Sequence, residues 1–248
     1  MHSQSEARIE KVKLSVKSLR VHRKTTASIK STPFNQIPTF GSPVSSKPPS
    51  SIRLYFENVN GLSTDVKSWK RNWKCKKLPY LWRRLNVDLM SLVETQAQPA
   101  LLDATCNTPS TLFAHETHVT KLSNNSNELI NKHQQGGLMS SVRGECCKLV
   151  TATSCDPTGL ARWQSIDLKN ANGKIRFITA YQGVPSKQTS NTVHQQQLRY
   201  WQRHNRNICP RKAFALDIKE HLHNSLQEGF AIILCLDSNE DMTSGRLF

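Results

Sequence analysis

Apolar residues recur at helical spacing in two stretches of the chain. In the first stretch they fall at i, i+3, i+4 and i+7, as Leu78, Leu81, Trp82 and Leu85. This spacing is typical of a helix that packs one face on a sheet. Further helices are predicted over residues 192–206 and 212–228, and Gly229 follows the last of them as a C-terminal cap.

Short apolar runs predict strands around these helices. A strand buried on both faces is apolar almost throughout, and Ala231–Leu236 has this character before the chain turns polar at Asp237. Asn172-Gly173 is a two-residue hairpin signal. Strands alternate with helices in the first third and last quarter, which describes a layered α/β domain. The predicted strands are Ile52–Phe56, Asp88–Thr95, Gly136–Val142, Arg162–Lys169, Lys174–Tyr181 and Phe230–Leu236.

Residues 1–50 differ in composition from the rest of the chain. They are rich in Ser, Thr, Pro, Lys and Arg and lack a sustained apolar period. We therefore predict a disordered basic tail ahead of a domain over residues 51–248. Lys11–Lys24 would form a basic amphipathic helix on an anionic surface. A mitochondrial presequence is disfavoured by the early Glu6 and Glu10, because such sequences are poor in acid.

The charge balance favours a polyanionic partner. Lys and Arg number 34 against 18 Asp and Glu, a formal net charge of +16, which suits nucleic acid or an anionic membrane surface. No apolar run approaches the roughly 20 residues of a membrane span. The seven cysteines have no secretory framework spacing, so reduced thiols in an intracellular compartment, the nucleus included, are expected. No Cys-x-x-Cys pair is present to hold zinc.

Polar side chains recur where the predicted strands end. In layered α/β folds, ligands collect outside the carboxyl ends of strands, so these side chains are expected to converge on one cleft. Taken singly, each has an ordinary structural explanation as a turn residue, a helix cap or a packed aromatic. The residues concerned are Asn58, Asn60, Glu94, Tyr181, Asp237 and Asn239.

The stretch Lys67–Arg84 interleaves lysine and arginine with aromatic residues. Cations that contact phosphates and aromatic faces that stack on bases are the two components of single-strand binding. Lys70, Arg71 and Lys74 are the candidate substrate-binding cations. The alternative is that Trp82 belongs to the core stripe and that the charges form the solvated outer face of the helix.

Five short segments resemble, in order and approximate spacing, motifs of the endonuclease/exonuclease/phosphatase superfamily. They are YFENVNGL, DLMSLVETQ, GGLMSSVRG, ITAYQGVP and IILCLDSNED. The superfamily includes pancreatic-type deoxyribonucleases, abasic-site endonucleases and the endonuclease domains of LINE-type retrotransposons. The resemblance spans residues 52–248 and implies a four-layered α/β sandwich (α+β class) of two packed mixed sheets flanked by helices. Residues 192–217 also resemble open reading frames of mobile elements.

The resemblance implies a divalent metal site. Glu94 matches the glutamate that ligates the metal ion, Asn58 matches an asparagine that positions metal and phosphate, and Asn60 stands beside it in the same turn. Mg²⁺ suits such a site because it binds through one or two carboxylates and keeps several waters beside substrate phosphate. Mn²⁺ is the alternative ion.

The resemblance also assigns catalytic roles. Tyr181 matches a tyrosine that contacts the scissile phosphate. Asp237 matches the aspartate that orients or deprotonates the attacking water, and Asn239 matches an amide that binds a phosphate oxygen. Leu236 departs from the pattern, because the family motif has glycine there.

The expected function is therefore Mg²⁺-dependent phosphodiester hydrolysis by an endonuclease-like domain of retrotransposon origin, with DNA favoured over RNA. A phosphatase or an RNA exonuclease on the same fold is an alternative, because a fold does not fix the substrate. A catalytically dead nucleic-acid-binding remnant is another. The family pattern continues past the Asp-x-Asn motif to a Ser-Asp-His motif, which has no match after Asn239. The chain is therefore expected to be truncated at its C-terminus and impaired in catalysis.

Overall fold

A computed structural model describes residues 46–62, 73–101, 112–113, 116–131, 133–187 and 191–240. Contacts group residues 1–48 apart from residues 49–248, and the description below concerns the second group. The predicted basic tail lies outside the described residues up to residue 45, as does the predicted helix at Lys11–Lys24. Within the described ranges, no helix is long and apolar enough to cross a membrane.

The first sheet contains four strands in the order β1-β2-β4-β3. They are β1 (Leu54–Asn58), β2 (Leu89–Val93), β3 (His118–Ser123) and β4 (Leu138–Arg143). β1 and β2 are parallel, whereas β4 is antiparallel to both of its neighbours. Every residue of β2 is buried, as its apolar run predicts for a central strand.

The second sheet has the order β5-β6-β7-β8, with β5 (Val150–Cys155), β6 (Trp163–Asn170), β7 (Gly173–Tyr181) and β8 (Phe230–Asp237). The β6–β7 hairpin is present, but the predicted turn is wrong by one residue. Gly173 already pairs with Asn170, so Ala171 and Asn172 form the loop. The Asn170 side chain accepts a hydrogen bond from the backbone N–H of Asn172 at 2.9 Å, which fixes the turn there.

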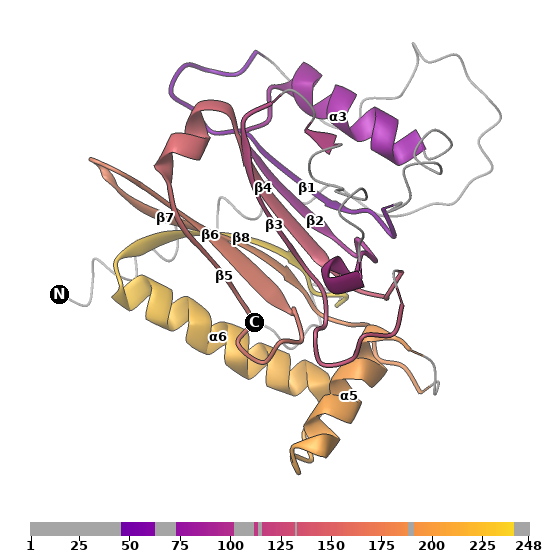
Figure 1. Cartoon of the computed structure of the whole chain (residues 1–248). Coiled ribbons are helices and arrows are strands. Elements are labelled where there is room, and N and C mark those ends of the chain that lie inside the picture. The colour runs from indigo at the N-terminus through magenta and orange to yellow at the C-terminus, as the bar shows by residue number, and fades with distance from the viewer. Residues whose placement is uncertain are drawn as a thin grey trace. The chain divides into compact units, whose positions relative to one another are not determined.

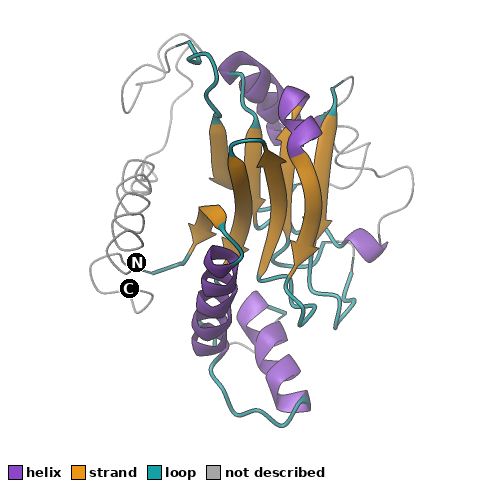
Figure 2. Cartoon of the chain, turned by 90° about the vertical axis from the view of Figure 1, so that its left-hand side faces the viewer, coloured by secondary structure: helices purple, strands orange, loops and turns teal. Residues whose placement is uncertain are grey.

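The two sheets pack face to face with helices on their outer sides (Figures 1 and 2). Trp82 and Leu78 of α3 (Trp73–Leu85) pack on the first sheet with Met90. Phe214 and Ile218 of α6 (Pro210–Gln227) pack on the second. The predicted four-layered sandwich of mixed sheets is thus confirmed. Among the described residues, the other helices are α5 (Val193–Arg203) and two 3₁₀ segments, η1 (Pro99–Leu101) and η2 (Gly144–Leu149).

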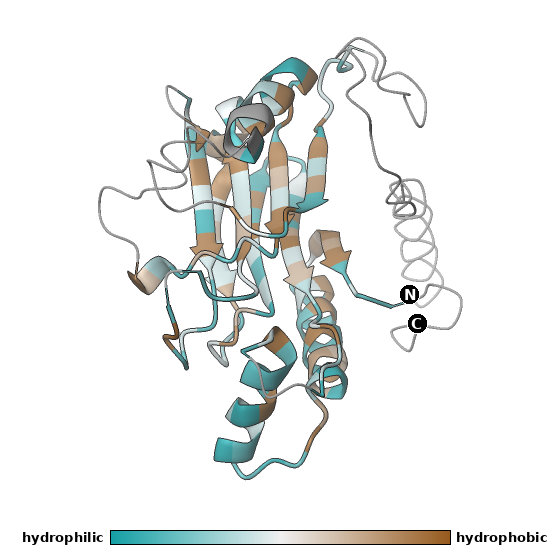
Figure 3. Cartoon of the chain, turned by 90° about the vertical axis from the view of Figure 1, so that its right-hand side faces the viewer, coloured by the Kyte–Doolittle hydropathy of each residue, from teal (hydrophilic) through white to brown (hydrophobic). Residues whose placement is uncertain are grey.

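Apolar residues concentrate in the strands, whereas α5 is mostly hydrophilic (Figure 3). Between the sheets, Leu89 and Val142 meet Ile166, Phe177 and Cys235. A polar chain also crosses this interface: the Gln164 amide donates to Ser140 at 2.7 Å, and Ser140 donates to Thr179 at 2.7 Å. Burying these groups is tolerated because each has a partner.

Two strands, β3 and β5, have no counterpart among the predicted strands. Both lie at sheet edges, and β5 is exposed along most of its length. Edge strands of mixed polarity do not produce an apolar run, so periodicity gave no signal for them.

The last strand, β8, is less buried than its apolar run predicted. Only Cys235 is fully buried, and the rest of the strand is intermediate or exposed. Ile232 and Leu234 pack toward α6, while Ile233 packs toward the other sheet. Both faces are therefore covered, but in the described part of the chain β8 has a neighbour only in β7, which leaves its other edge open.

Partly buried histidines predict an acid-sensitive fold. Burial lowers the pKa of His221, which lies against Trp163 with ring centroids 5.9 Å apart, and it likewise lowers the pKa of His118 and His194. The unfolded chain takes up these protons near pH 6.5, whereas the folded chain resists them until lower pH. The free energy of unfolding is therefore highest above that pH and is expected to fall on acidification through the window below it.

Urea unfolding at pH 7.5 and pH 5.5 measures this loss of stability. His221→Gln should reduce the difference between the two conditions, whereas the exposed His223→Gln should not. Carboxylates whose pKa is lowered, such as Glu128, change the free energy of unfolding only below their usual pKa of 4.5. They therefore do not contribute to the difference between pH 7.5 and pH 5.5. Equal stability at both pH values would contradict the prediction.

Candidate active site

Polar side chains from both sheets meet at one end of the sandwich. Because β1 runs parallel to β2 and β7 runs parallel to β8, the carboxyl ends of the strands in each pair lie together. The Asn58 side chain donates from Nδ2 to Asp237 Oδ2 at 2.8 Å, and the Tyr181 hydroxyl donates to the Glu94 carboxylate. Each hydrogen bond joins one sheet to the other.

The turn after β1 is fixed by its own asparagines. Asn58 Oδ1 accepts from the backbone N–H of Asn60 at 3.0 Å, which is an Asx turn. Gly61 N then donates to the Glu94 carbonyl at 2.7 Å, so the turn stays paired with the segment that follows β2. The Lys74 ammonium donates to carbonyl oxygens of this turn, at 3.1 Å to Asn60 and at 3.3 Å to Gly61.

The backbone at the site is strained in several places. Glu94, Gln96, Asn60 and Asn239 have φ angles of 54°, 55°, 43° and 48°, in the left-handed region that glutamate and glutamine rarely adopt. Holding a glutamate or glutamine in this conformation costs about 1–3 kcal/mol of conformational free energy, and residues held in this way cluster at functional sites. The Gln96 N–H donates to the Gly136 carbonyl at 2.7 Å, which helps to hold the strained segment against β4.

Tyr181 is held as a hydrogen-bond donor. Its ring is 6% exposed, and burial, the hydrogen bond to Glu94 and the charges of Glu94 and Asp237 raise its pKa. The phenol therefore keeps its proton near neutral pH. A protonated phenol in this position is suited to donate to a carboxylate or to a phosphate oxygen.

The Asp237 carboxylate is held by amides. Besides Asn58, the backbone N–H of Asn239 donates to its Oδ1 at 3.3 Å. The Asn239 side chain donates in turn to the Gln182 carbonyl at 2.8 Å, and Gln182 N donates to the Asp237 carbonyl at 2.9 Å. The sequence-predicted residues Asn58, Glu94, Tyr181, Asp237 and Asn239 are thus brought to one place.

The predicted substrate-binding cations have different outcomes. Lys70 and Arg71 lie outside the described residues. Lys74 contacts the backbone of the Asn58–Gly61 turn, which makes it a support of the site. Trp82 is fully buried in the core, as the alternative interpretation of this stretch held.

The ligand atoms available here suit a cation whose remaining coordination positions are filled by water and substrate. Among the described residues, no three His, Cys, Asp or Glu side chains are grouped closely enough to hold a metal ion. Glu94 supplies one carboxylate, of which Oε1 accepts from Tyr181. Asn58 supplies an amide oxygen that accepts a single backbone N–H. One carboxylate with neutral oxygens is compatible with Mg²⁺ or Mn²⁺ bound beside a phosphate. It is too few ligands to surround the ion with protein atoms alone.

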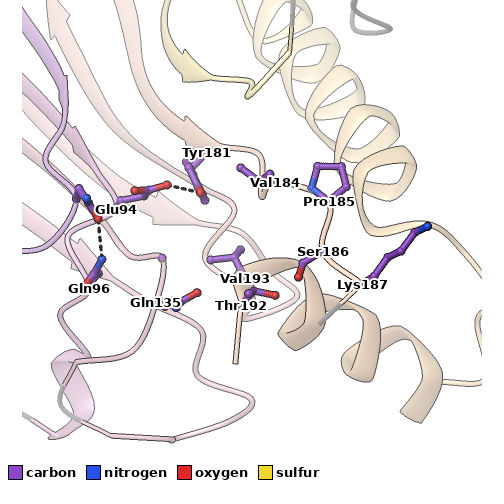
Figure 4. A pocket seen from close by; sticks show the side chains of 12 residues that line it. Glu94, Gln96, Gln135, Tyr181, Val184, Pro185, Ser186, Lys187, Thr192 and Val193 are labelled. Atoms are coloured by element: carbon purple, nitrogen blue, oxygen red, sulfur yellow. Dashed lines mark hydrogen bonds between the residues drawn. The ribbon is translucent and has the colours of Figure 1, made fainter. Parts of the chain in front are cut away.

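A cavity of about 490 Å³ opens beside Glu94 and Tyr181. Figure 4 shows Gln96 and Gln135 on one side of it and the segment Val184–Lys187 on the other. Sequence reasoning did not single out these residues, although Gln96 and Val184 fall within the motif segments. Their side chains gave no signal, because an exposed glutamine or valine in a loop is unremarkable.

Comparisons with known proteins identify the fold. No family model and no curated protein matches the sequence. A solved structure of an AP endonuclease from Leishmania major superposes with a TM-score of 0.51 at 15% identity, over 75% of this chain and 54% of that chain. The human nocturnin catalytic domain matches with a TM-score of 0.44 at 14% identity, over 77% and 65%. An endonuclease/exonuclease/phosphatase family protein from Leptotrichia buccalis matches at 0.40 and 14%, over 56% and 58%.

The protein therefore has the endonuclease/exonuclease/phosphatase fold, and the resemblance seen in the five motifs is confirmed at the level of the fold. The chain spans about half the length of the AP endonuclease that it matches.

Proposed function

We propose that this chain is a metal-dependent phosphodiester hydrolase that acts on nucleic acid, with DNA favoured over RNA, and that it is an endonuclease-like domain of LINE-type retrotransposon origin. The observation that carries the proposal is the pair of hydrogen bonds, Asn58 to Asp237 and Tyr181 to Glu94, that brings four strand ends from two sheets together. A genomic DNA substrate would accord with a nuclear location.

Each side chain has a role in this proposal. Asp237 orients the attacking water and takes its proton as the new O–P bond forms and the bond to the leaving oxygen breaks. Tyr181 donates to a phosphate oxygen, and Asn239 assists in holding the phosphate. Glu94 and Asn58 would hold Mg²⁺, which when bound stabilises negative charge on the phosphate and the leaving oxygen.

Magnesium binding tests the metal assignment. Glu94→Ala should abolish Mg²⁺ binding in a calorimetric titration, because Glu94 is the carboxylate expected to hold the ion. Glu128→Ala is the matched control, since that carboxylate is held by Arg199 and Arg203 on α5. Mg²⁺ binding that survives in the Glu94 variant would remove the assignment.

Substrate preference separates the alternatives. Nicking of a plasmid in the presence of Mg²⁺ supports the endonuclease. Release of inorganic phosphate from monoesters without nicking would indicate a phosphatase instead, and trimming of RNA from an end would indicate an exonuclease. DNA binding without hydrolysis under any condition would indicate the inactive remnant.

Salt dependence tests nucleic-acid contact by the Lys67–Arg84 stretch. If Lys70 and Arg71 contact phosphates, log affinity should fall linearly with log salt, because counterions are released. Reversing both charges to glutamate should reduce the slope by roughly two. Lys219→Glu, at an exposed position of α6, should change the slope less. Fluorescence anisotropy with a labelled duplex measures the affinity at each salt concentration. An unchanged slope in the double variant would show that these cations do not contact phosphates and face solvent instead.

A further inference from the structure

The cavity beside Glu94 and Tyr181 has two chemically different walls (Figure 4). One wall, here the amide wall, consists of Asn60, Gln96 and Gln135. The other, here the apolar ledge, consists of Val184 and Pro185. The volume of the whole cavity, about 490 Å³, falls in the range of small-molecule sites.

The charge of the lining argues against a polyphosphorylated substrate. Among the described lining residues, Lys187 is the only cation and Glu94 the only acid. A ligand with several phosphates would need several cations to offset the loss of water. Amide side chains both donate and accept, so the amide wall suits a neutral group with mixed donors and acceptors.

The apolar ledge suits a flat apolar face. Val184 is 53% exposed although it lies in the cavity lining next to Pro185. Covering such side chains removes apolar surface from water. A nucleobase combines the two properties that these walls would recognise: a hydrogen-bonding edge and an apolar face.

We infer that this cavity is a nucleoside subsite, which takes the base and sugar attached to the phosphate held at Glu94 and Tyr181. The base packs on the apolar ledge with its polar edge toward the amide wall. The inference rests on the proposed function, because it places the scissile phosphate beside the cavity. It extends that function from contact with the sugar-phosphate backbone to contact with the base.

The Gln96 side chain and the backbone that carries Gln135 are held in place before any ligand binds. The Gln96 side chain donates to Asn60 Oδ1 at 3.2 Å. Behind the wall, the Gln196 side chain donates to the Gln135 carbonyl at 3.4 Å and accepts from Gln134 at 2.8 Å and from Asn125 at 3.0 Å. These buried amides fix the backbone that carries Gln135. A preformed wall lowers the ordering cost of binding.

Close packing supports the same segment. A Cβ on Gly137 would lie 2.5 Å from Thr95 Oγ1, and a Cβ on Gly136 would lie 2.9 Å from Val193 Cγ2. Both glycines also have positive φ angles, 93° at Gly136 and 86° at Gly137, which larger residues rarely adopt. The backbone between Gln135 and β4 is therefore confined on both sides.

Two probes of equal charge test the subsite in the full chain with Mg²⁺. One is a dithymidine phosphorothioate, which resists hydrolysis, and the other is the same sugar-phosphorothioate dimer without bases. The dinucleotide is expected to bind about ten-fold more tightly by calorimetry, as one or two neutral hydrogen bonds and apolar contact would give. Gln135→Ala should reduce this preference about five-fold and leave the affinity of the dimer without bases unchanged. Gln227→Ala, an exposed glutamine of α6, should alter neither affinity.

The outcomes separate the two proposals. Equal affinity for both probes, with binding of both weakened by Glu94→Gln, would overturn the nucleoside subsite and leave the phosphate cleft standing. A Gln135→Ala variant that binds both probes equally more weakly would also overturn it, because the residue would then act on the phosphate or on the fold. If neither probe binds or competes with inorganic phosphate, the proposed function itself is overturned, and the subsite with it.

Discussion

Asp237→Asn is expected to lower the rate of phosphodiester hydrolysis by about 10²- to 10⁴-fold, the usual contribution of a general base. The substitution removes the negative charge and the ability to take a proton while it keeps the size of the side chain. Asn58 and the backbone N–H of Asn239 donate to different oxygens of Asp237, so the amide oxygen can keep one of the two contacts. Because the side chain keeps its size, the fold should be preserved. Plasmid nicking with Mg²⁺ measures the rate, and thermal unfolding checks the fold.

Glu220→Gln is the matched control, because this acid is exposed on α6 and its loss changes the net charge by the same amount. Its nicking rate should equal that of the unaltered chain. A folded Asp237→Asn variant that nicks plasmid at the original rate would remove Asp237 from the reaction. The comparison needs a measurable starting rate, so nicking is followed over an extended digestion at high protein concentration.

The elements that the sequence predicted best are those with local causes. β2 is recognisable because a central strand needs apolar residues on both faces, and α3 because Leu78 and Trp82 share one helical face. β3 and β5 were missed because edge strands tolerate polar side chains. In each case, whether the element could be predicted depends on how many of its sides are buried.

The site shows a different limit. Polar residues at strand ends could be found one by one, but their meeting depends on how the sheets pack. Asn58 and Asp237 are 179 residues apart and belong to different sheets, so no local pattern predicts that they share a hydrogen bond. The left-handed backbone at Glu94 is likewise a product of tertiary structure, since glutamate alone does not favour it.

Lys74 illustrates how composition leaves the partner of a cation undetermined. In the sequence it is one cation of a basic stretch with aromatic neighbours, which suggested contact with phosphates. In the structure its ammonium reaches the carbonyls of Asn60 and Gly61. A lysine that fixes the turn after β1 supports Asn58 indirectly, so its charge serves the architecture of the site.

The second substitution with a large expected effect is at Arg162, which is completely buried beneath α6. Its guanidinium contacts Asp156, which is equally buried, with Nε 2.6 Å from Oδ2, and it contacts Asp217 at 2.7 Å. It also lies over the ring of Trp163, 4.6 Å from the centroid. Burial opposes the charge, but the two carboxylates outweigh it, so the pKa of Arg162 is raised.

Arg162→Met is therefore expected to reduce the free energy of unfolding by about 3–5 kcal/mol, because it leaves the Asp156 carboxylate buried without its cation. The double variant Arg162→Met with Asp156→Asn should recover part of this loss, since the uncompensated charge is then gone. Arg203→Met is the surface control: its side chain is 52% exposed in an ion pair with Glu128, and its loss should cost about 1 kcal/mol or less. Urea unfolding of the four proteins measures these differences, and equal losses at Arg162 and Arg203 would show that the buried pair contributes no more than a surface contact.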